Sequence, residues 1–250
     1  MTSLYVRTAL VALTLLAATT SAPATEEAAS AGAQLSEAER QRELAKLMQI
    51  VAARQQPLQD ADLTLHLNGS TPEIGAANAR LVIAEFSSYR CGFCRRHFVD
   101  TMPRIVTELI DPGVVRYAFF DYAAQSSHPP DRDAAEVTRC AAEQGRYWEM
   151  REHLFQQVRT PLQERLPPHA VVSGLDPEAL AECTGSDETA AAVSHDLRQA
   201  LALGVRGTPS FLMGYPSEDG TEIRVVKRIV GAQPYAVFAE AVDALLTEVP

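Results

Sequence analysis

A CxxC sequence at residues 91–94 lies where a predicted strand passes into a predicted helix. The apolar run 81–86 predicts a buried strand, and apolar residues spaced by three and four predict a helix over 94–110. Pro103 inside this pattern should kink the helix. A second strand is predicted over 114–122. Strand, helix and strand in this order are typical of a parallel crossover unit that begins an α/β domain.

The remaining C-terminal sequence predicts further helices and a hairpin. Residues 129–203 show helical patterns broken by prolines and glycines, which predicts an all-helical insertion. The runs 211–213 and 223–230 predict an antiparallel hairpin, and 235–246 predicts a closing amphipathic helix.

The N-terminus has the pattern of a secretory signal. Arg7 supplies a positive charge, 9–18 is apolar, and Ala22-Pro23-Ala24 fits a cleavage site. A membrane anchor is the alternative, but the apolar run is shorter than the ~20 residues that a spanning helix needs. We therefore expect residues 1–24 to be removed, leaving a soluble protein that is periplasmic or otherwise extracytoplasmic.

Residues 25–56 are expected to form a flexible leader and then a helix. Ser36 and Glu39 fit a capping box, and an apolar stripe follows them. The stripe can pack on the same chain or on a second copy; we favour a monomer and leave the oligomeric state open. The main domain is predicted to cover 57–250, starting with an edge hairpin in 57–79.

Charge and cysteine content exclude several functions. The formal net charge of −10 repels nucleic acid and anionic lipid. Export would place the four cysteines in an oxidising compartment, where disulfides persist. A CxxC sequence can also be half of a zinc site, but Cys140 and Cys183 are far apart and neither belongs to a second CxxC. The sequence predicts no metal and no cofactor.

The two cysteines of the motif are expected to have different roles. Backbone N–H groups and the helix dipole favour a thiolate at a helix start, so Cys91 is the predicted nucleophile. One turn later, Cys94 is placed to attack a mixed disulfide formed at Cys91. Basic residues flank the pair: Arg90, Arg95, Arg96 and His97. Their positive charge would favour the thiolate further, but such side chains are more often only solvated, and none is predicted to be catalytic.

Two segments resemble a known family. Residues 81–86 followed by Cys91-Gly92-Phe93-Cys94 resemble the core strand and active site of DsbA-like proteins in the thioredoxin superfamily, and 204–211 resembles their cis-proline loop. The resemblance covers most of the chain after about residue 60. It implies an α/β thioredoxin fold with the helical insertion between the second and third core strands. It also implies a protein thiol-disulfide oxidoreductase.

The resemblance assigns a substrate-binding surface. It implies a cis bond between Thr208 and Pro209, which together with Gly92 and Phe93 would contact substrate. The strongest oxidants of the family carry Pro-His between the cysteines. Because the Phe93 side chain cannot hydrogen-bond a thiolate, we predict a less oxidising potential, and the direction of electron flow stays open.

Glu85 matches the buried acidic residue of the family, which implies a proton relay for Cys94. An unpaired buried carboxylate is costly and tends to hold its proton. An outward-facing position is the alternative. We predict that Glu85→Gln slows exchange without unfolding the protein.

Cys140 and Cys183 fall on predicted helices of the insertion, and a structural disulfide between them is the favoured reading. Buried thiols or a second redox couple are the alternatives.

Three functions remain. The first is disulfide exchange with reduced or misoxidised exported polypeptides, with reoxidation by a DsbB-like membrane partner. The second is an isomerase or reductase kept reduced by a DsbD-like partner, and the third is a non-catalytic peptide-binding or chaperone module.

Overall fold

The chain divides into two units, residues 1–48 and 49–250. The computed structural model describes residues 36–42, 45–46, 63–123, 129–156, 172 and 174–248. In the first unit, residues 37–42 and 45–46 are helical. Glu39 N donates to Ser36 Oγ at 3.3 Å and Ser36 N donates to Glu39 Oε2 at 2.8 Å, so the predicted capping box is present. The predicted signal, 1–24, and most of the predicted leader and helix lie outside the described residues.

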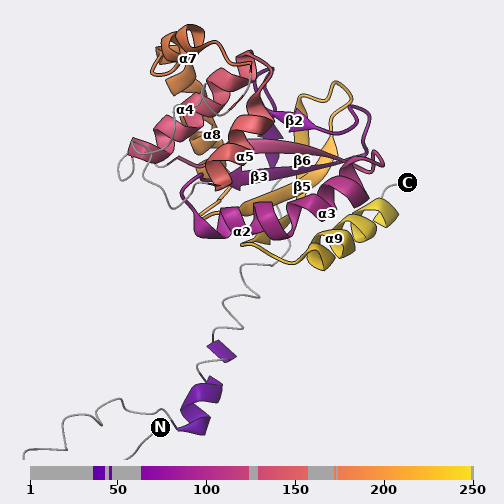
Figure 1. The fold of residues 1–250 in the computed structure, drawn as a ribbon. Coiled ribbons are helices and arrows are strands. Elements are labelled where there is room, and N and C mark those ends of the chain that lie inside the picture. The colour runs from indigo at the N-terminus through magenta and orange to yellow at the C-terminus, as the bar shows by residue number, and fades with distance from the viewer. Residues whose placement is uncertain are drawn as a thin grey trace, which may run out of the picture. The chain divides into compact units, whose positions relative to one another are not determined.

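The described part of the second unit contains one six-stranded sheet (Figure 1). Its strands in chain order are β1 (Thr64–His66), β2 (Glu73–Ile74), β3 (Leu81–Ser87), β4 (Val115–Asp121), β5 (Ser210–Pro216) and β6 (Glu222–Val230). The order across the sheet is β1-β6-β5-β3-β4-β2. Strands β3 and β4 are parallel, as predicted, and the other neighbours are antiparallel. Strand β3 therefore lies inside the sheet, between β5 and β4.

The predicted hairpin in 57–79 is wrong. Strand β1 pairs with β6 and β2 pairs with β4, so the two strands lie at opposite edges of the sheet. They have only three and two residues, too few for a stable hairpin of their own. Each instead extends an edge of the larger sheet. Leu65, which lies opposite Ile223 in β6, is thereby fully buried.

The helix predicted over 94–110 is divided into three pieces. These are α2 (Gly92–Asp100), α3 (Met102–Ile105) and a π-helical segment, Val106–Ile110. Thr101 separates α2 from α3, and Pro103 lies in the first turn of α3. A proline is tolerated there because its missing N–H has no intrahelical partner.

The described residues between β4 and β5, where the sequence predicts an insertion, include four helices. They are α4 (Pro129–Glu143), α5 (Tyr147–Gln156), α7 (Pro177–Cys183) and α8 (Asp187–Ala202). A disulfide bond joins Cys140 in α4 to Cys183 at the end of α7, with their Cα atoms 5.7 Å apart. The closing helix α9 (Tyr235–Glu248) follows β6. No helix in the described residues is both long and apolar enough to span a bilayer.

Side chains of β3 alternate between the two faces of the sheet. Leu81 and Ile83 pack with residues of α3 and α9, which lie on one side of the sheet in Figure 1. Val82 and Phe86 pack in a separate cluster on the other face, with Ala200 at the end of α8. The alternation places the side chains of odd-numbered β3 residues on the side of α3 and α9.

Candidate active site

Cys91 lies at the N-cap of α2. Its backbone is extended, with φ −77° and ψ 116°, and its side chain makes no capping hydrogen bond. The sulfur of Cys91 is half-buried, whereas Cys94 in the first turn is fully buried. Both cysteines are free thiols, so the structure describes the reduced form of the pair. The four-residue connection from β3 thus delivers one accessible and one buried sulfur to the start of a helix.

A loop distant in sequence meets this cysteine. The Cys91 thiol donates a hydrogen bond to the carbonyl oxygen of Thr208, with a sulfur–oxygen distance of 3.4 Å. The peptide bond between Thr208 and Pro209 is cis. Strand β5 begins at the next residue and pairs with β3, so the sheet itself places this loop beside the CxxC sequence.

The local contacts separate the acidities of the two thiols. A hydrogen bond from Cys94 is the largest cause that lowers the pKa of Cys91, to about 5, and burial opposes it. The Thr208 side chain and the backbone N–H groups of Cys94 and Phe93 lower this pKa further. Burial raises the pKa of Cys94 well above its ordinary value, and the neighbouring Cys91 adds to the rise. The pair therefore combines an ionised, accessible Cys91 with a protonated, buried Cys94.

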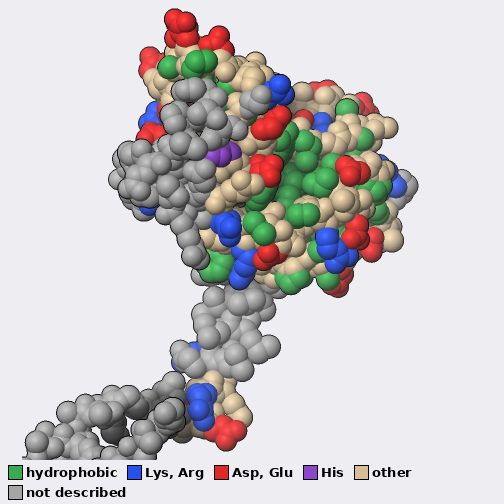
Figure 2. Space-filling model, viewed as in Figure 1, with side chains coloured by type: hydrophobic (Ala, Val, Ile, Leu, Met, Phe, Trp, Pro, Cys, Tyr) green, Lys and Arg blue, Asp and Glu red, His purple; other side chains and the backbone are tan. Residues whose placement is uncertain are grey.

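The residues between the cysteines face solvent. Gly92 is exposed and the Phe93 side chain is 59% exposed. The Arg96 guanidinium lies 5.0 Å from the centre of the Phe93 ring and donates to the carbonyl of Ala232 at 3.2 Å. Figure 2 shows basic side chains on the surface around α2. Phe93 thus offers an apolar surface next to Cys91, and its side chain has no polar group that could hydrogen-bond either sulfur.

Glu85 is fully buried in β3, on the face that packs with α3 and α9, so the outward-facing alternative is wrong. Its carboxylate is also paired. Arg151 Nη2 donates to Glu85 Oε2 at 2.6 Å, and the Tyr117 hydroxyl donates to the same oxygen at 2.5 Å. The other oxygen, Oε1, has no hydrogen-bond partner among the described residues.

Sequence reasoning missed Arg151, although the sequence carries a signal. The buried residues of α5 repeat at helical spacing: Tyr147, Met150, Arg151, Leu154 and Phe155. A charged residue on the apolar face of a helix requires a buried partner of opposite charge. The sequence also predicts a buried acid, Glu85, in β3. The helical spacing of α5 alone does not show that Arg151 pairs with it.

His97 differs from the sequence expectation. It is buried, and its ring packs against Phe211 and Phe238, with ring centres 4.5 and 5.4 Å apart. Burial lowers the pKa of His97 to about 4, so the ring is neutral at neutral pH. The expectation that His97 adds positive charge around the cysteines is therefore wrong. Its Nε2 lies 3.3 Å from the Tyr117 hydroxyl, which joins it to the Glu85 contacts.

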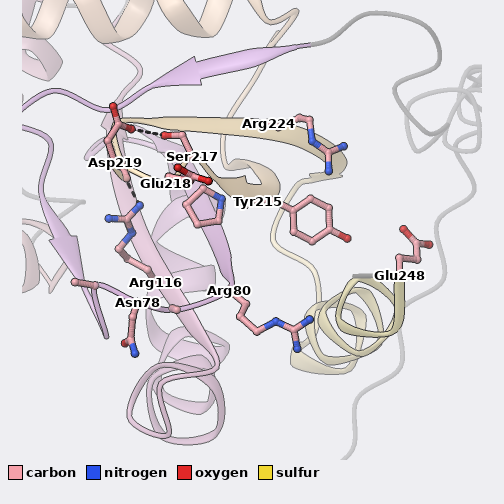
Figure 3. Close-up of a pocket in the computed structure, with 13 residues that line it drawn as sticks. Asn78, Arg80, Arg116, Tyr215, Ser217, Glu218, Asp219, Arg224 and Glu248 are labelled. Carbon is pink, nitrogen blue, oxygen red and sulfur yellow. Dashed lines mark hydrogen bonds between the residues drawn. The ribbon is translucent and has the colours of Figure 1, made fainter. Parts of the chain in front are cut away.

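A separate cavity of about 580 Å³ opens at the opposite end of β3 from Cys91. Figure 3 shows three arginines around it: Arg80, Arg116 and Arg224. Arg116 donates to the carbonyl of Gly220 at 3.2 Å and lies 3.6 Å from Glu73 Oε2. None of the residues predicted for the active site lines this cavity.

Comparisons with known proteins agree with the fold. The family model described as "Thioredoxin" matches residues 67–221. This region includes the CxxC sequence and the cis-proline loop. A variant of alpha-DsbA1 from Wolbachia pipientis has a similar structure, with a TM-score of 0.62 and 19% sequence identity, covering 74% of this chain and 94% of that one.

Two relatives in sequence have different names. The Na(+)/H(+) antiporter NhaA of Herminiimonas arsenicoxydans is 28% identical over 178 residues, which cover 65% of this chain. The aligned chain spans only 26% of that antiporter, so its name describes a much longer protein. Disulfide bond formation protein D of Bacillus subtilis is 24% identical over 147 residues, covering 56% of this chain and 65% of that protein.

The family match extends over more than half of the chain and includes the parallel β3–β4 unit. The structural match, at low identity, shows the fold of a DsbA-type protein. The chain belongs to the thioredoxin family.

Proposed function

We propose that this protein is an exported thiol-disulfide oxidoreductase that exchanges disulfides with secreted or periplasmic polypeptides through Cys91 and Cys94. One observation supports this most directly. The sulfur of an ionisable, half-buried Cys91 lies 3.4 Å from the carbonyl oxygen of Thr208 in the Thr208–Pro209 loop, with the protonated Cys94 thiol one turn behind it. An incoming chain can therefore reach Cys91 but not Cys94.

In the oxidising direction, a substrate thiolate attacks the sulfur of Cys91 in the Cys91–Cys94 disulfide. The new sulfur–sulfur bond forms as the old one breaks, and Cys94 takes the electron pair and a proton. A second substrate thiolate then attacks the mixed disulfide, and Cys91 leaves as a thiolate. Two electrons pass from the substrate dithiol to the pair. The lowered pKa of Cys91 makes it the better leaving group in this second step.

Oxidative refolding of reduced ribonuclease tests the proposal. The oxidised protein should accelerate the return of ribonuclease activity, and Cys91→Ser should abolish the acceleration. The double variant Cys140→Ala/Cys183→Ala, which removes the two disulfide-bonded cysteines and leaves Cys91 and Cys94, should keep it. An unchanged refolding rate with Cys91→Ser would instead favour a non-catalytic peptide-binding or chaperone module.

The exposed Phe93 favours a second candidate, an isomerase or reductase. Because its side chain gives Cys91 no hydrogen bond, the reduced form receives less stabilisation than a polar residue would provide. Shuffling of scrambled ribonuclease by the reduced protein, together with the reduction potential of the pair, separates this candidate from an oxidase. A DsbB-like membrane partner would reoxidise an oxidase, and a DsbD-like partner would keep an isomerase reduced.

The proposal places residues 25–250 outside the cytoplasm after removal of residues 1–24. The disulfide between Cys140 and Cys183 supports this location, because such bonds persist in oxidising compartments. Fractionation of cells that express the full chain, followed by N-terminal sequencing, tests it. A cytoplasmic protein that retains Met1 would contradict export.

A further inference from the structure

The largest fully buried side chain in the described residues is that of a charged residue, Arg151. Removing a guanidinium from water costs several kcal/mol unless the charge is paired and hydrogen-bonded. The carboxylate of Glu85 supplies this pairing at 2.6 Å, and both side chains are at most 1% exposed. The ion pair connects helix α5 of the insertion to the central strand β3.

Arg151 also contacts the elements that carry the CxxC pair. Its guanidinium lies over the rings of Phe98 in α2, at 5.2 Å, and Phe119 in β4, at 4.4 Å. Two aromatic rings of α5 complete the enclosure, those of Trp148 and Phe155. One side chain of the insertion is therefore packed between strands β3 and β4 and the active-site helix.

Glu85 is well placed to act on Cys94. Successive side chains in a strand alternate, so Glu85 and Ser87 lie on the same face of β3. Both residues act on the Cys94 thiol: Ser87 lowers its pKa and the charge of Glu85 raises it. Arg151 and Tyr117 both hold Oε2 of Glu85, so Oε1 keeps its lone pairs free of any described donor.

We propose that Arg151 is a positioning residue of the CxxC centre: by pairing with Oε2 it fixes the orientation of the Glu85 carboxylate and offsets the charge that Glu85 exerts on Cys94. This inference rests on the proposed function. When Cys94 attacks a mixed disulfide at Cys91, the Cys94 proton passes to Glu85 Oε1. The Cys94–Cys91 bond forms, the bond from Cys91 to the substrate sulfur breaks, and the substrate leaves as a thiolate.

The position of Arg151 on α5 gives the insertion a role in this chemistry. The charge that offsets Glu85 comes from outside the β-α-β core, and it stays in place only while α5 is packed on the core. The titratable groups that act most on Arg151 are Glu85, Tyr117, Tyr147 and Tyr89, and the neutral His97 ring is also affected by its charge. Glu85 is the one acid among them, and the buried tyrosines have pKa values raised above the ordinary value.

The test is the pH dependence of mixed-disulfide resolution. Nitrothiobenzoate is attached to Cys91, and its release by Cys94 is followed by absorbance at several pH values. In Arg151→Met the buried Glu85 carboxylate has no counter-charge, so a higher pH is needed before it can accept the Cys94 proton. The rate profile should therefore move upward by about one pH unit or more. Arg146→Met, which removes the surface arginine paired with Glu149 at 3.4 Å, is the matched control and should leave the profile unchanged.

A second comparison covers the case in which Arg151→Met does not fold. Glu85→Gln leaves Arg151 positively charged, and Glu85→Gln/Arg151→Met removes both charges. The midpoint of the profile should be about one pH unit higher in the double variant than in Glu85→Gln. An equal midpoint would reduce Arg151 to a packing role and overturn the inference. If the unsubstituted protein itself releases no nitrothiobenzoate, the proposed function fails, independently of Arg151.

Discussion

The Cys91 sulfur and the Thr208 carbonyl oxygen lie 3.4 Å apart, although 117 residues separate them in the chain. The pairing of β3 with β5 brings them together, because Cys91 follows the end of β3 and Thr208 precedes the start of β5. The reactive sulfur thus lies against the backbone that leads into the neighbouring strand, β5. An extended substrate chain that pairs with this backbone would carry its own cysteine to Cys91.

The first prediction concerns the acidity of Cys91. Its pKa is lowered to about 5 from an ordinary value of 9.0, so alkylation of the reduced protein by iodoacetamide should follow an ionisation near pH 5. A thiol that is more acidic when folded stabilises the folded reduced form. This stabilisation is fully present above pH 9 and is lost as the pH falls to 5. The free energy of unfolding, measured against Cys91→Ser, should therefore rise from pH 5 to pH 9. An alkylation midpoint above about 8 would contradict the assignment.

The second prediction tests the loop beside the sulfur. The Thr208 side chain lowers the pKa of Cys91 through a hydrogen bond, and Thr208→Val removes that donor while keeping the shape of the side chain. The alkylation midpoint should rise by roughly one pH unit, the size expected for one hydrogen bond to a charged group. Thr107→Val, a change on the exposed side of the π-helical segment, serves as the control and should not shift it.

The third prediction concerns Phe93. Phe93→His introduces a ring nitrogen that can donate to the Cys91 thiolate, so the reduced form should become more stable and the protein a stronger oxidant. Equilibration with reduced and oxidised glutathione measures the change. Phe93→Leu keeps the site apolar and should leave the equilibrium constant within about twofold of the original. The same constant for Phe93→His as for Phe93→Leu would show that this position does not set the potential.

Much of the site could be predicted because its signals are local. A buried strand, a CxxC sequence and a helix follow one another within thirty residues of chain, and Thr208-Pro209 is a recognisable short motif. Local patterns also indicated that Glu85 is unusual, because it interrupts an apolar run. They located both ends of the Cys140–Cys183 disulfide on helices.

The parts that sequence reasoning missed depend on contacts between distant segments. Strand β1 and strand β2 carry too few residues to show which longer strand each one joins. Arg151 interrupts the apolar face of α5, but its partner lies 66 residues earlier in β3. The sequence pattern groups His97 with the basic residues that flank the CxxC motif. Its burial against Phe238 of α9 follows only from the packing of the two helices.

The fourth prediction revises the expectation for Glu85→Gln. Glutamine has the size of glutamate and keeps one oxygen acceptor, but it leaves Arg151 without a counter-charge. The free energy of unfolding should therefore fall by about 3 kcal/mol. If Glu85 accepts the Cys94 proton, resolution of a mixed disulfide should also slow by about a hundredfold. Thermal unfolding and stopped-flow kinetics measure the two effects. Glu149→Gln, which breaks the exposed pair between Glu149 in α5 and Arg146 just before it, should change stability by less than about 1 kcal/mol. An unchanged resolution rate would remove the relay role.

The fifth prediction separates the two cysteine pairs. The Cys140–Cys183 bond closes a loop of 43 residues, and the chain-entropy model assigns such a loop about 4 kcal/mol. Cys140→Ala/Cys183→Ala should therefore unfold at a lower urea concentration, and its free energy of unfolding should fall by about 4 kcal/mol. Because Cys91 receives its stabilising hydrogen bonds from Cys94, Thr208 and nearby backbone, its alkylation midpoint should not move. If the double variant instead keeps its stability but loses exchange activity, Cys140 and Cys183 act as a second redox couple that passes electrons to or from Cys91 and Cys94.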